Sequence, residues 1–486
     1  MSGEQTEVPI GQRLADLAAG RGDAVAVVAA DATLSWAELD RLSNRAGRAL
    51  AGMGAGPGSM VTIALPNTAA FVVAAMACWK VGAVPQPVSA RLPAAEIQAI
   101  VGLAGPPVVL AEHAFDAGRP VLSVAGLLER GDDGGPLPVA VSPAWKAPTS
   151  GGSTGRPKLI VAGAPGVVAP GMGRLWRLES GATMVMPGPL YHNGPFTSAM
   201  TGLFEGAALV LMPRFDAEQT LRLVQEHRAT WLYTVPTMLA RIWRLPEDVR
   251  AGYDLSSLRT VWHLAAPCPP WLKEAWIGWL GPDVIWELYA GTEAQAVTII
   301  SGREWLAHRG SVGRVVVGAM RIQDADGRDL PPGEVGEVWL RSPDGVPPTY
   351  RYIGAEARAR DGWESLGDMG SMDQDGYLYL ADRASDMILV GGANVYPAEV
   401  EAALEAHPAI FSSAVIGLPD DDLGQRVHAI IQAGPALDLE DVRRHLDGLL
   451  VRYQHPRTFE IVAGPLRDDA GKVRRGQLRA DRIRAE

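Results

Sequence analysis

An alternation of strand and helix patterns early in the chain limits its fold more than any other feature. A short apolar strand is predicted over Val61–Leu65, an apolar helix over Phe71–Val81, and an extended return over residues 82–87. Strand, helix and strand in succession are typical of parallel α/β layering. Ser35 and Glu38 have the spacing of a capping box, so a helix is predicted to begin after Ser35. The chain is therefore expected to be an α/β protein.

The length of the chain predicts more than one domain. Its 486 residues exceed what one hydrophobic core normally supports, and 47% hydrophobic with 20% charged residues indicates a globular protein with a large interior. The net charge of −11 would repel phosphates, so no nucleic-acid partner is expected. The 2 cysteines lack ligand spacing, which predicts neither a disulfide framework nor a zinc site. Since no signal sequence and no apolar run of spanning length is visible, we expect a cytoplasmic enzyme without a membrane span.

A run rich in glycine and hydroxyl groups is the strongest sign of function. It reads Thr149-Ser150-Gly151-Gly152-Ser153-Thr154-Gly155-Arg156-Pro157-Lys158. Glycine lets backbone N–H groups approach an anion, hydroxyls donate to phosphate oxygens, and lysine adds positive charge, so the run predicts a phosphate-binding loop. Such runs also occur in flexible linkers, but the apolar segments on both sides and the stiffening proline favour binding. The interposed Arg156-Pro157 and the missing Ser/Thr after Lys158 separate it from the phosphate loop of many kinases.

Four segments farther along the chain, together with this loop, resemble the motifs of one enzyme family. They are Tyr289-Ala290-Gly291-Thr292-Glu293, Leu366-Gly367-Asp368, Gly391-Gly392-Ala393-Asn394 and Gly471-Lys472-Val473-Arg474. In this order and spacing they resemble the adenylate-forming superfamily, which includes acyl-CoA synthetases, luciferases and peptide-synthetase adenylation domains. The resemblance spans nearly the whole chain.

The resemblance implies a two-domain architecture. Residues 1–384 would form an N-terminal adenylation domain of layered α/β subdomains plus a small β subdomain, with the nucleotide and acyl sites. Residues 385–486 would form a small, mobile α+β C-terminal domain that carries the adenylation lysine. Ser385 stands at the hinge position, where relatives usually have aspartate or lysine. A hinge residue needs only to tolerate a large change in backbone angles, so serine is acceptable there.

The same resemblance implies the residues of a nucleotide site. Tyr289 would stack on adenine, Thr292 would donate to the α-phosphate, and Glu293 would hold Mg²⁺. Asp368 would accept hydrogen bonds from the ribose hydroxyls, and Arg383 would contact the nucleotide. The expected nucleotide contacts also include Thr149, Ser150, Gly151, Gly152, Ser153, Thr154, Gly155, Lys158, Ala265, Ala266 and Pro267. Leu264 stands where relatives have glycine before that Ala-Ala-Pro turn, and a plain strand-ending turn is the structural alternative.

The C-terminal motifs imply roles in the two half-reactions. Lys472 would bridge the substrate carboxylate and the α-phosphate, although a lone lysine is usually solvated surface. Gly391 and Gly392 resemble the glycine pair that, in acyl-CoA synthetases, lies on a strand lining the pantetheine tunnel. A β-bulge is the alternative interpretation of the pair. Lys472, Thr292, Glu293 and His192 are the residues expected at the reacting groups.

The sequence predicts less about the acyl site than about the nucleotide site. His192 resembles the aromatic or histidine that lines the acyl tunnel of relatives, although a lone histidine is more often structural. Residues 189–198 contain no acid to pair with an ammonium group, which disfavours an α-amino acid substrate. Apolar walls and a bulky apolar acid are suggested by Trp262, Pro267, Trp271 and Trp286. The segment 265–273 resembles ligases of bile-acid-type or other alicyclic acids.

The resemblance therefore implies an acid–thiol ligase that uses ATP, Mg²⁺ and coenzyme A on a bulky apolar carboxylic acid, whether alicyclic, polycyclic or aryl. A freestanding ligase that loads a carrier protein is an alternative, and the absence of a carrier domain after Lys472 disfavours a peptide-synthetase module. A non-catalytic nucleotide-binding homologue is disfavoured because Glu293, Asp368 and Lys472 occur together. The expected partners are the acid, ATP and CoA, and pairing as a homodimer is left open.

Overall fold

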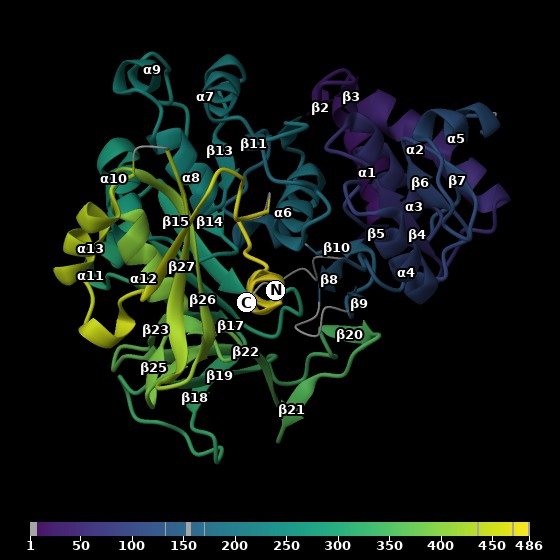
Figure 1. Ribbon diagram of the computed structural model, residues 1–486. Helices are drawn as coiled ribbons and strands as arrows, with labels where there is room; N and C mark the ends of the chain where they lie inside the picture. Colours follow the sequence, from purple (N-terminus) through teal and green to yellow (C-terminus); the bar gives the residue numbers. More distant parts are fainter. Residues whose placement is uncertain are drawn as a thin grey trace.

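The central element of the structure is one large mixed sheet. This computed structural model describes residues 7–131, 133–151, 157–169, 171–434, 437–468 and 471–484 (Figure 1). The parallel part of the sheet runs, in spatial order, through β15 (Ile285–Ala290), β14 (Thr260–Leu264), β13 (Trp231–Thr234), β11 (Thr183–Met186), β12 (Ala208–Leu211) and β2 (Val25–Val28). β3 (Thr33–Ser35) closes that edge antiparallel to β2. The strands between residues 183 and 290, together with β2, thus form the parallel part of one sheet.

The other half of the sheet is antiparallel and continues from β15 without a break. Its strands are β16 (Val297–Ser301), β17 (Ser311–Val317), β23 (Tyr377–Arg383), β22 (Trp363–Met372), β19 (Gly336–Arg341) and β18 (Ala319–Gln323), with β21 (Arg358–Arg360) beside β22. The expected small β subdomain is therefore an extension of the main sheet. The helices that connect successive strands of the main sheet are α6 (Asn193–Phe204), α7 (Ala217–Glu226), α8 (Pro236–Trp243), α9 (Glu247–Ala251), α10 (Pro270–Leu280) and α11 (Gly302–Ala307).

A second, smaller sheet lies in the purple and blue part of Figure 1 and is wholly parallel. Its strands in spatial order are β5 (Val84–Pro87), β4 (Met60–Ala64), β6 (Val109–Ala111) and β7 (Val121–Leu122). The helices of this part are α1 (Ile10–Arg21), α2 (Trp36–Gly52), α3 (Ala69–Lys80), α4 (Ala94–Ala104) and α5 (Val124–Arg130). The capping box is confirmed, because the Glu38 N–H donates to the Ser35 hydroxyl at 3.2 Å and the Ser35 N–H donates to the Glu38 carboxylate at 2.8 Å.

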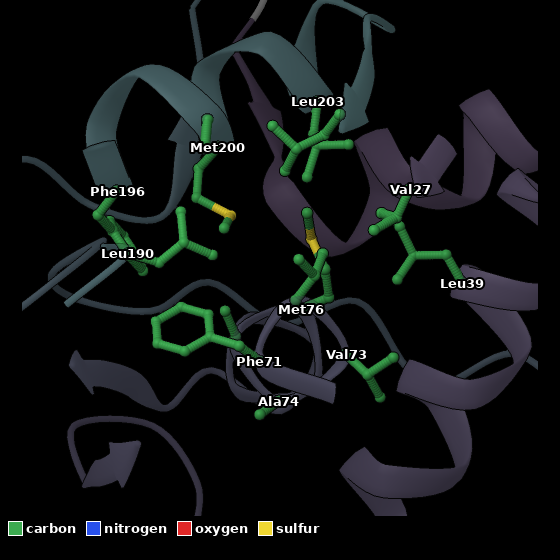
Figure 2. Packing of buried hydrophobic residues seen from close by; sticks show 14 of the residues in the cluster. Val27, Leu39, Phe71, Val73, Ala74, Met76, Leu190, Phe196, Met200 and Leu203 are labelled. Atoms are coloured by element: carbon green, nitrogen blue, oxygen red, sulfur yellow. The ribbon is translucent and has the colours of Figure 1, made fainter. Parts of the chain in front are cut away.

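Helix α3 joins the two sheets through one shared core. It is buried along nearly its whole length, which explains why its sequence is apolar on every face. Figure 2 shows Phe71 and Met76 of α3 directed toward Leu190, Met200 and the neighbouring residues of the α6 region. The phenyl rings of Phe71 and Phe196 meet edge to face with centroids 6.2 Å apart. This packing fixes the smaller sheet against the parallel half of the main sheet.

The C-terminal segment forms its own sheet around its own core. Its strands are β24 (Ile388–Val390), β25 (Ala393–Val395), β26 (Ile410–Asp420), β27 (Gly424–Ala433) and β28 (Thr458–Val462), and its helices are α12 (Pro397–Glu405), α13 (Leu439–Asp447) and α14 (Arg475–Ile483). The expected α/β architecture, with a large N-terminal and a small C-terminal part, is confirmed. The boundary expected after residue 384 falls in the turn between β23 and β24 and stays a prediction.

Three smaller features complete the fold. β8 (Thr149–Gly151), β9 (Pro157–Ala162) and β20 (Tyr350–Ile353) form a three-stranded sheet, and β1 (Val8–Pro9) pairs with β10 (Val167–Val168). Short 3₁₀ turns occupy η1 (Met172–Arg174) and η2 (Arg452–Gln454). In the part of the chain that the structure describes, no helix has the length and apolar character needed to cross a membrane.

Candidate active site

The predicted site residues of the N-terminal part gather at one edge of the main sheet. His192 follows β11, Ala265 follows β14, and Glu293 follows β15. Since these strands are parallel, their carboxyl ends lie at the same edge, where open α/β sheets bind their ligands. The order of the strands thus brings together residues that are up to about a hundred positions apart in the sequence.

The predicted phosphate-binding loop lies between two paired strands. β8 and β9 are antiparallel, with Ser150 opposite Lys158. The hydroxyl of Thr149 accepts a hydrogen bond from Gln86 Nε2 at 2.9 Å, and Gln86 Oε1 accepts one from Thr62 Oγ1 at 2.6 Å. These bonds attach the first strand of the hairpin to the smaller sheet. Gly152, Ser153, Thr154 and Gly155, along with the side chain of Ser150, lie outside the described residues.

Lys158 on β9 and Glu293 in the turn after β15 meet although they are far apart in the sequence. The Lys158 Nζ lies 3.6 Å from Glu293 Oε1, and the same oxygen accepts a hydrogen bond from the Tyr352 hydroxyl at 2.5 Å. Lys158 also lies over the Tyr352 ring, 3.9 Å from its centroid. Sequence reasoning missed Tyr352, whose only local signal is the alternation of Tyr350 and Tyr352 along a short strand.

The acidic groups suit a metal ion that is shared with a nucleotide. Among residues 7–131, 133–151, 157–169, 171–434, 437–468 and 471–484, no cluster of three or more His, Cys, Asp or Glu side chains could hold a metal by itself. Mg²⁺ usually binds one or two carboxylates together with substrate phosphates and water. Glu293 is buried beside the lysine of the phosphate-binding loop, so its carboxylate fits that kind of site.

Tyr289, Asp368 and Arg383 form a connected group. The Tyr289 hydroxyl donates to Asp368 Oδ2 at 2.7 Å, and Arg383 Nε donates to Asp368 Oδ1 at 3.3 Å. Burial, followed by the charge of Asp368, raises the pKa of Tyr289 well above its usual value. The tyrosine is therefore neutral and acts as a donor that orients the carboxylate.

The packing around Gly291 shows what one departure from the family pattern, leucine at position 366, contacts in the structure. An ideal Cβ at Gly291 would lie 2.3 Å from Leu366 Cδ1 and 3.0 Å from Glu293 Oε2. Leu366 stands where relatives have threonine, and it fills the space that a side chain at position 291 would need. A side chain at position 291 would have to displace Leu366 and the Glu293 carboxylate. Thr292, next to it, is half-buried in the turn after β15.

The turn after β14 has a strained backbone. Ala265 adopts φ of +74°, a left-handed conformation that is uncommon for a residue with a Cβ. Ala266 is half-buried, whereas Pro267 is exposed. Leu264 is buried, and its Cδ1 lies 3.0 Å from the position of an ideal Cβ at Gly194, so it packs on the start of α6.

His192 precedes α6 and has an unpartnered ring nitrogen. Its Nε2 is buried and has no hydrogen-bond partner among the described residues. Burial lowers the pKa of His192 to about 4; the charge of Asp468 opposes this shift and that of Lys472 adds to it. The imidazole is therefore neutral at ordinary pH and lies close to the hairpin that carries Lys472.

Lys472 reaches the same site from the C-terminal part. It lies on a tight hairpin in which the Lys472 N–H donates to Asp468 Oδ1 at 2.9 Å and the Asp468 N–H donates to the Lys472 carbonyl at 3.0 Å. Gly471 has φ of +77°, and an ideal Cβ there would lie 3.2 Å from Thr237 Oγ1 in the first turn of α8. The hairpin therefore packs against the N-terminal part.

The Lys472 ammonium is within electrostatic range of several of the predicted nucleotide residues. Burial lowers the pKa of Lys472, and Arg383 lowers it further, while Asp468, Glu293 and Asp368 raise it. Charges can act on one another in this way only over short distances. The Lys472 hairpin packs on α8, and Lys472 lies within electrostatic range of Glu293, Asp368, Arg383 and His192.

Direct contacts hold the C-terminal part in this orientation. Asp382, at the end of β23, accepts a hydrogen bond from the Ala398 N–H at the start of α12 at 2.7 Å and lies 3.7 Å from Arg475. Arg244, just after α8, donates to the main-chain oxygens of Ile410 at 2.8 Å and Phe411 at 2.7 Å.

The glycine pair Gly391 and Gly392 is not on a strand, which corrects the expectation from the sequence. The two residues form the turn of a hairpin, because Val390 at the end of β24 pairs with Ala393 at the start of β25 without a bulge. Their φ values are +56° and +88°, and a two-residue turn of this kind requires positive φ at both central positions. Both glycines are exposed. Ser385 is exposed in the turn before β24.

The four residues expected as apolar walls do not line one surface. Trp262 is fully buried in the main core, with its ring 5.8 Å from that of Trp176 and 5.9 Å from that of Trp286. Trp271 lies on α10 and packs against the separate core on the other side of the sheet. Pro267 is exposed. The prediction of a shared wall is therefore wrong.

A buried lysine near His192 was also missed. Lys146 lies three residues before Thr149, and its Nζ donates to Asn193 Oδ1 and, at 2.6 Å, to Thr197 Oγ1 in the first turns of α6. Burial lowers the pKa of Lys146 to about 7. A lysine within an apolar segment just before the loop was the sequence signal that could have found it.

Comparison with known proteins places these features among related enzymes. The AMP-binding enzyme family matches residues 14–351, and the AMP-binding enzyme C-terminal domain matches residues 399–472. A feruloyl-CoA synthase of Amycolatopsis sp is 31% identical over 479 residues, which cover 94% of this chain and 95% of that protein. The 3-[(3aS,4S,7aS)-7a-methyl-1,5-dioxo-octahydro-1H-inden-4-yl]propanoyl:CoA ligase of Mycobacterium tuberculosis is 31% identical over 500 residues, or 94% of this chain and 96% of that protein. Among solved structures, the o-succinylbenzoate CoA synthetase of Bacillus subtilis, in complex with its acyl-adenylate intermediate, matches with a TM-score of 0.82 and 25% identity over 97% of this chain and 98% of that chain.

Proposed function

Because this chain belongs to the AMP-binding enzyme family and is an adenylate-forming enzyme of the acyl-CoA synthetase type, we propose that it activates a bulky apolar carboxylic acid as an acyl-adenylate and transfers the acyl group to CoA. The observation that carries this proposal is the packing of the Lys472 hairpin on α8, where Lys472 is within range of the charges of Glu293, Asp368 and Arg383. That arrangement places one mobile cation among the groups expected to hold the nucleotide.

In the first half-reaction, a carboxylate oxygen of the acid attacks the α-phosphorus of ATP, and the bond to pyrophosphate breaks. Lys472 would lie between the carboxylate and the α-phosphate and stabilise the charge that develops there. Lys158 and the phosphate-binding loop would hold the outgoing pyrophosphate. Mg²⁺ held by Glu293 would neutralise phosphate charge.

The ribose and base of the nucleotide would be held at the other side of the cluster. Asp368 would accept hydrogen bonds from the ribose hydroxyls in the orientation that Tyr289 and Arg383 give it. The turn from Ala265 to Pro267 would pack against the adenine ring. These residues contribute binding and orientation, and no protein nucleophile is needed.

In the second half-reaction, the sulfur of CoA attacks the acyl carbon, the bond to AMP breaks, and the thiol proton is released to solvent. We propose that the C-terminal part turns about Ser385, withdraws Lys472 and brings the Gly391–Gly392 turn to the acyl-adenylate. A turn without side chains would leave room for the pantetheine arm. The exposed position of this turn in the present structure is compatible with such an exchange.

The preference for an apolar acid rests on chemistry near His192. The neutral imidazole and the buried Leu264 offer no charge, the nearby Lys146 ammonium is already bonded to Asn193 and Thr197, and residues 189–198 contain no acid to bind an ammonium group. The two ligases named above act on a phenylpropenoate and on an alicyclic propanoate, which supports a bulky ring-containing acid for this chain as well.

The test is a product analysis with ATP, Mg²⁺ and a panel of fatty, aryl and alicyclic acids, with and without CoA. We expect acid-dependent release of pyrophosphate and AMP, and an acyl-CoA product identified by mass. If acyl-adenylate accumulates although CoA is present, the acyl acceptor is a carrier protein and not CoA. Formation of ADP and phosphate would overturn the proposal.

A further inference from the structure

Strand β20 brings two tyrosines to two buried or half-buried acids. The Tyr352 hydroxyl donates to Glu293 Oε1 at 2.5 Å, and the Tyr350 hydroxyl donates to Glu364 Oε2 at 2.7 Å. β20 pairs with β9, the strand of Lys158, as its position beside β9 in Figure 1 also shows. A segment almost 200 residues beyond the phosphate-binding loop therefore becomes its neighbour.

The contacts of the Glu293 carboxylate distinguish its two oxygens. The Tyr352 hydroxyl and the Lys158 ammonium both approach Oε1. Oε2 lies on the side of Gly291, where an ideal Cβ would be 3.0 Å from it. The glutamate is thus held by one oxygen, and its other oxygen is directed toward the turn that contains Thr292.

The main chain of Glu293 is held from the same strand region. The Thr349 hydroxyl, one residue before β20, donates to the carbonyl oxygen of Glu293 at 2.7 Å. Together with the bond from Tyr352, this fixes both the backbone and the side chain of the glutamate. A carboxylate fixed at two points loses little further freedom when it binds an ion.

The ring of Tyr352 has a second contact. The Lys158 Nζ lies 3.9 Å from the ring centroid, within the range in which a cation is attracted to an aromatic face. The lysine therefore rests between the ring and Oε1 of Glu293. A phosphate that approaches would draw this ammonium away from Oε1, while the hydroxyl of Tyr352 would remain there.

We propose that Tyr352 is a positioning residue that holds Glu293 by Oε1, so that Oε2 alone is presented to the divalent ion, and that keeps Lys158 beside the glutamate until phosphates arrive. This inference rests on the proposed function, because it requires Glu293 to face a metal–nucleotide complex. Mg²⁺ takes carboxylate oxygens singly in a strict octahedron, whereas Ca²⁺ accepts both oxygens of one carboxylate at longer distances. Tyr352 therefore favours Mg²⁺ over Ca²⁺.

The sharpest variant is Tyr352→Phe, which keeps the ring under Lys158 and removes only the hydroxyl. Tyr350→Phe is the matched control, because it keeps the ring that packs on Tyr352 with centroids 4.8 Å apart and removes only a hydroxyl that bonds Glu364. The measurement is Mn²⁺ binding by electron paramagnetic resonance in the presence of a non-hydrolysable ATP analogue. We expect Mn²⁺ affinity to fall about tenfold in Tyr352→Phe, which corresponds to about 1.4 kcal/mol, and to stay unchanged in Tyr350→Phe.

A second measurement distinguishes a positioning role of Tyr352 from a general weakening of metal binding. The ratio of Ca²⁺ to Mg²⁺ affinity, measured by competition against Mn²⁺, should rise in Tyr352→Phe and not in Tyr350→Phe. Adding Tyr352→Phe to Glu293→Gln should produce almost no further loss, since the two groups act as one unit.

The outcomes keep this inference apart from the proposed function. Equal Mn²⁺ affinity and an equal metal ratio in wild type and Tyr352→Phe would overturn the role of Tyr352, as would the same loss in Tyr350→Phe. Absence of acid-dependent pyrophosphate release from the wild type would overturn the proposed function instead. The metal measurement needs only a nucleotide analogue and does not depend on that reaction.

Discussion

Replacing Lys146 with methionine should stabilise the protein, and most strongly at low pH. Lys146 is 6% exposed, and its Nζ contacts only neutral groups among the partners that the structure shows: Asn193 Oδ1, Thr197 Oγ1 at 2.6 Å, and the Trp145 ring at 4.3 Å from its centroid. Burial lowers its pKa from 10.5 to about 7. The folded state therefore binds fewer protons than the unfolded state between these two pKa values.

The magnitude follows from this pKa difference. A shift of about 3.5 units corresponds to about 5 kcal/mol, at about 1.4 kcal/mol per unit. Below pH 7 the lysine is charged in both states, so the full penalty opposes folding; between pH 7 and 10.5 the penalty shrinks as pH rises, because deprotonation becomes easier. Methionine has no such penalty but loses two hydrogen bonds at about 1 kcal/mol each. Near pH 6 the free energy of unfolding of the variant should exceed that of the wild type by about 3 kcal/mol. This difference should fall by about 4 kcal/mol toward pH 10, where the variant becomes slightly less stable than the wild type.

The assay is urea unfolding of wild type and Lys146→Met at five pH values from about 6 to 10, with midpoints compared at equal slopes. Lys80→Met is the control, because Lys80 is also buried but pairs with Asp40 at 2.5 Å. Removing Lys80 leaves that carboxylate without its partner and should destabilise the protein. A stability difference for Lys146→Met that does not change with pH, or that is unfavourable at pH 6, would refute the reasoning.

Three further variants test the site and the domain arrangement. Lys472→Ala should slow acid-dependent adenylation at least about 100-fold yet still convert pre-made acyl-adenylate and CoA to thioester, and equal losses in both steps would refute its role. Gly392→Trp should do the reverse, because a bulky side chain would obstruct the turn; normal thioester output would contradict the proposed tunnel. Asp382→Ala removes the acceptor for the Ala398 N–H and a partner of Arg475, so it should lower the adenylation rate relative to the thioester-forming rate. Unchanged half-reaction rates in Asp382→Ala would show that these contacts do not hold the orientation.

Local signals in the sequence predicted much of the fold. The capping box at Ser35 and the apolar strand and helix that follow depend on neighbouring residues, and the structure confirms them. Lys158 and Glu293 were each expected in the nucleotide site from the family resemblance, and their side chains lie 3.6 Å apart. Such features can be recognised without knowing which strands pair.

Features that depend on which strands pair, or on which face of the sheet a side chain lies, could not be predicted from the sequence. Tyr352 reaches Glu293 only because β20 pairs with β9, and no local pattern encodes that register. Trp262 and Trp271 looked like one wall but point into separate cores, because successive elements cover opposite faces of the sheet. The Gly391–Gly392 pair was expected on a strand, whereas positive φ at both positions makes it a turn.

The most direct test of the central claim is acid-dependent exchange of labelled pyrophosphate into ATP in the absence of CoA. The account predicts that the wild type exchanges label only when an apolar carboxylic acid and Mg²⁺ are both present, and that Lys472→Ala abolishes the exchange. Exchange that proceeds equally without acid, or that survives the loss of Lys472, would contradict the account.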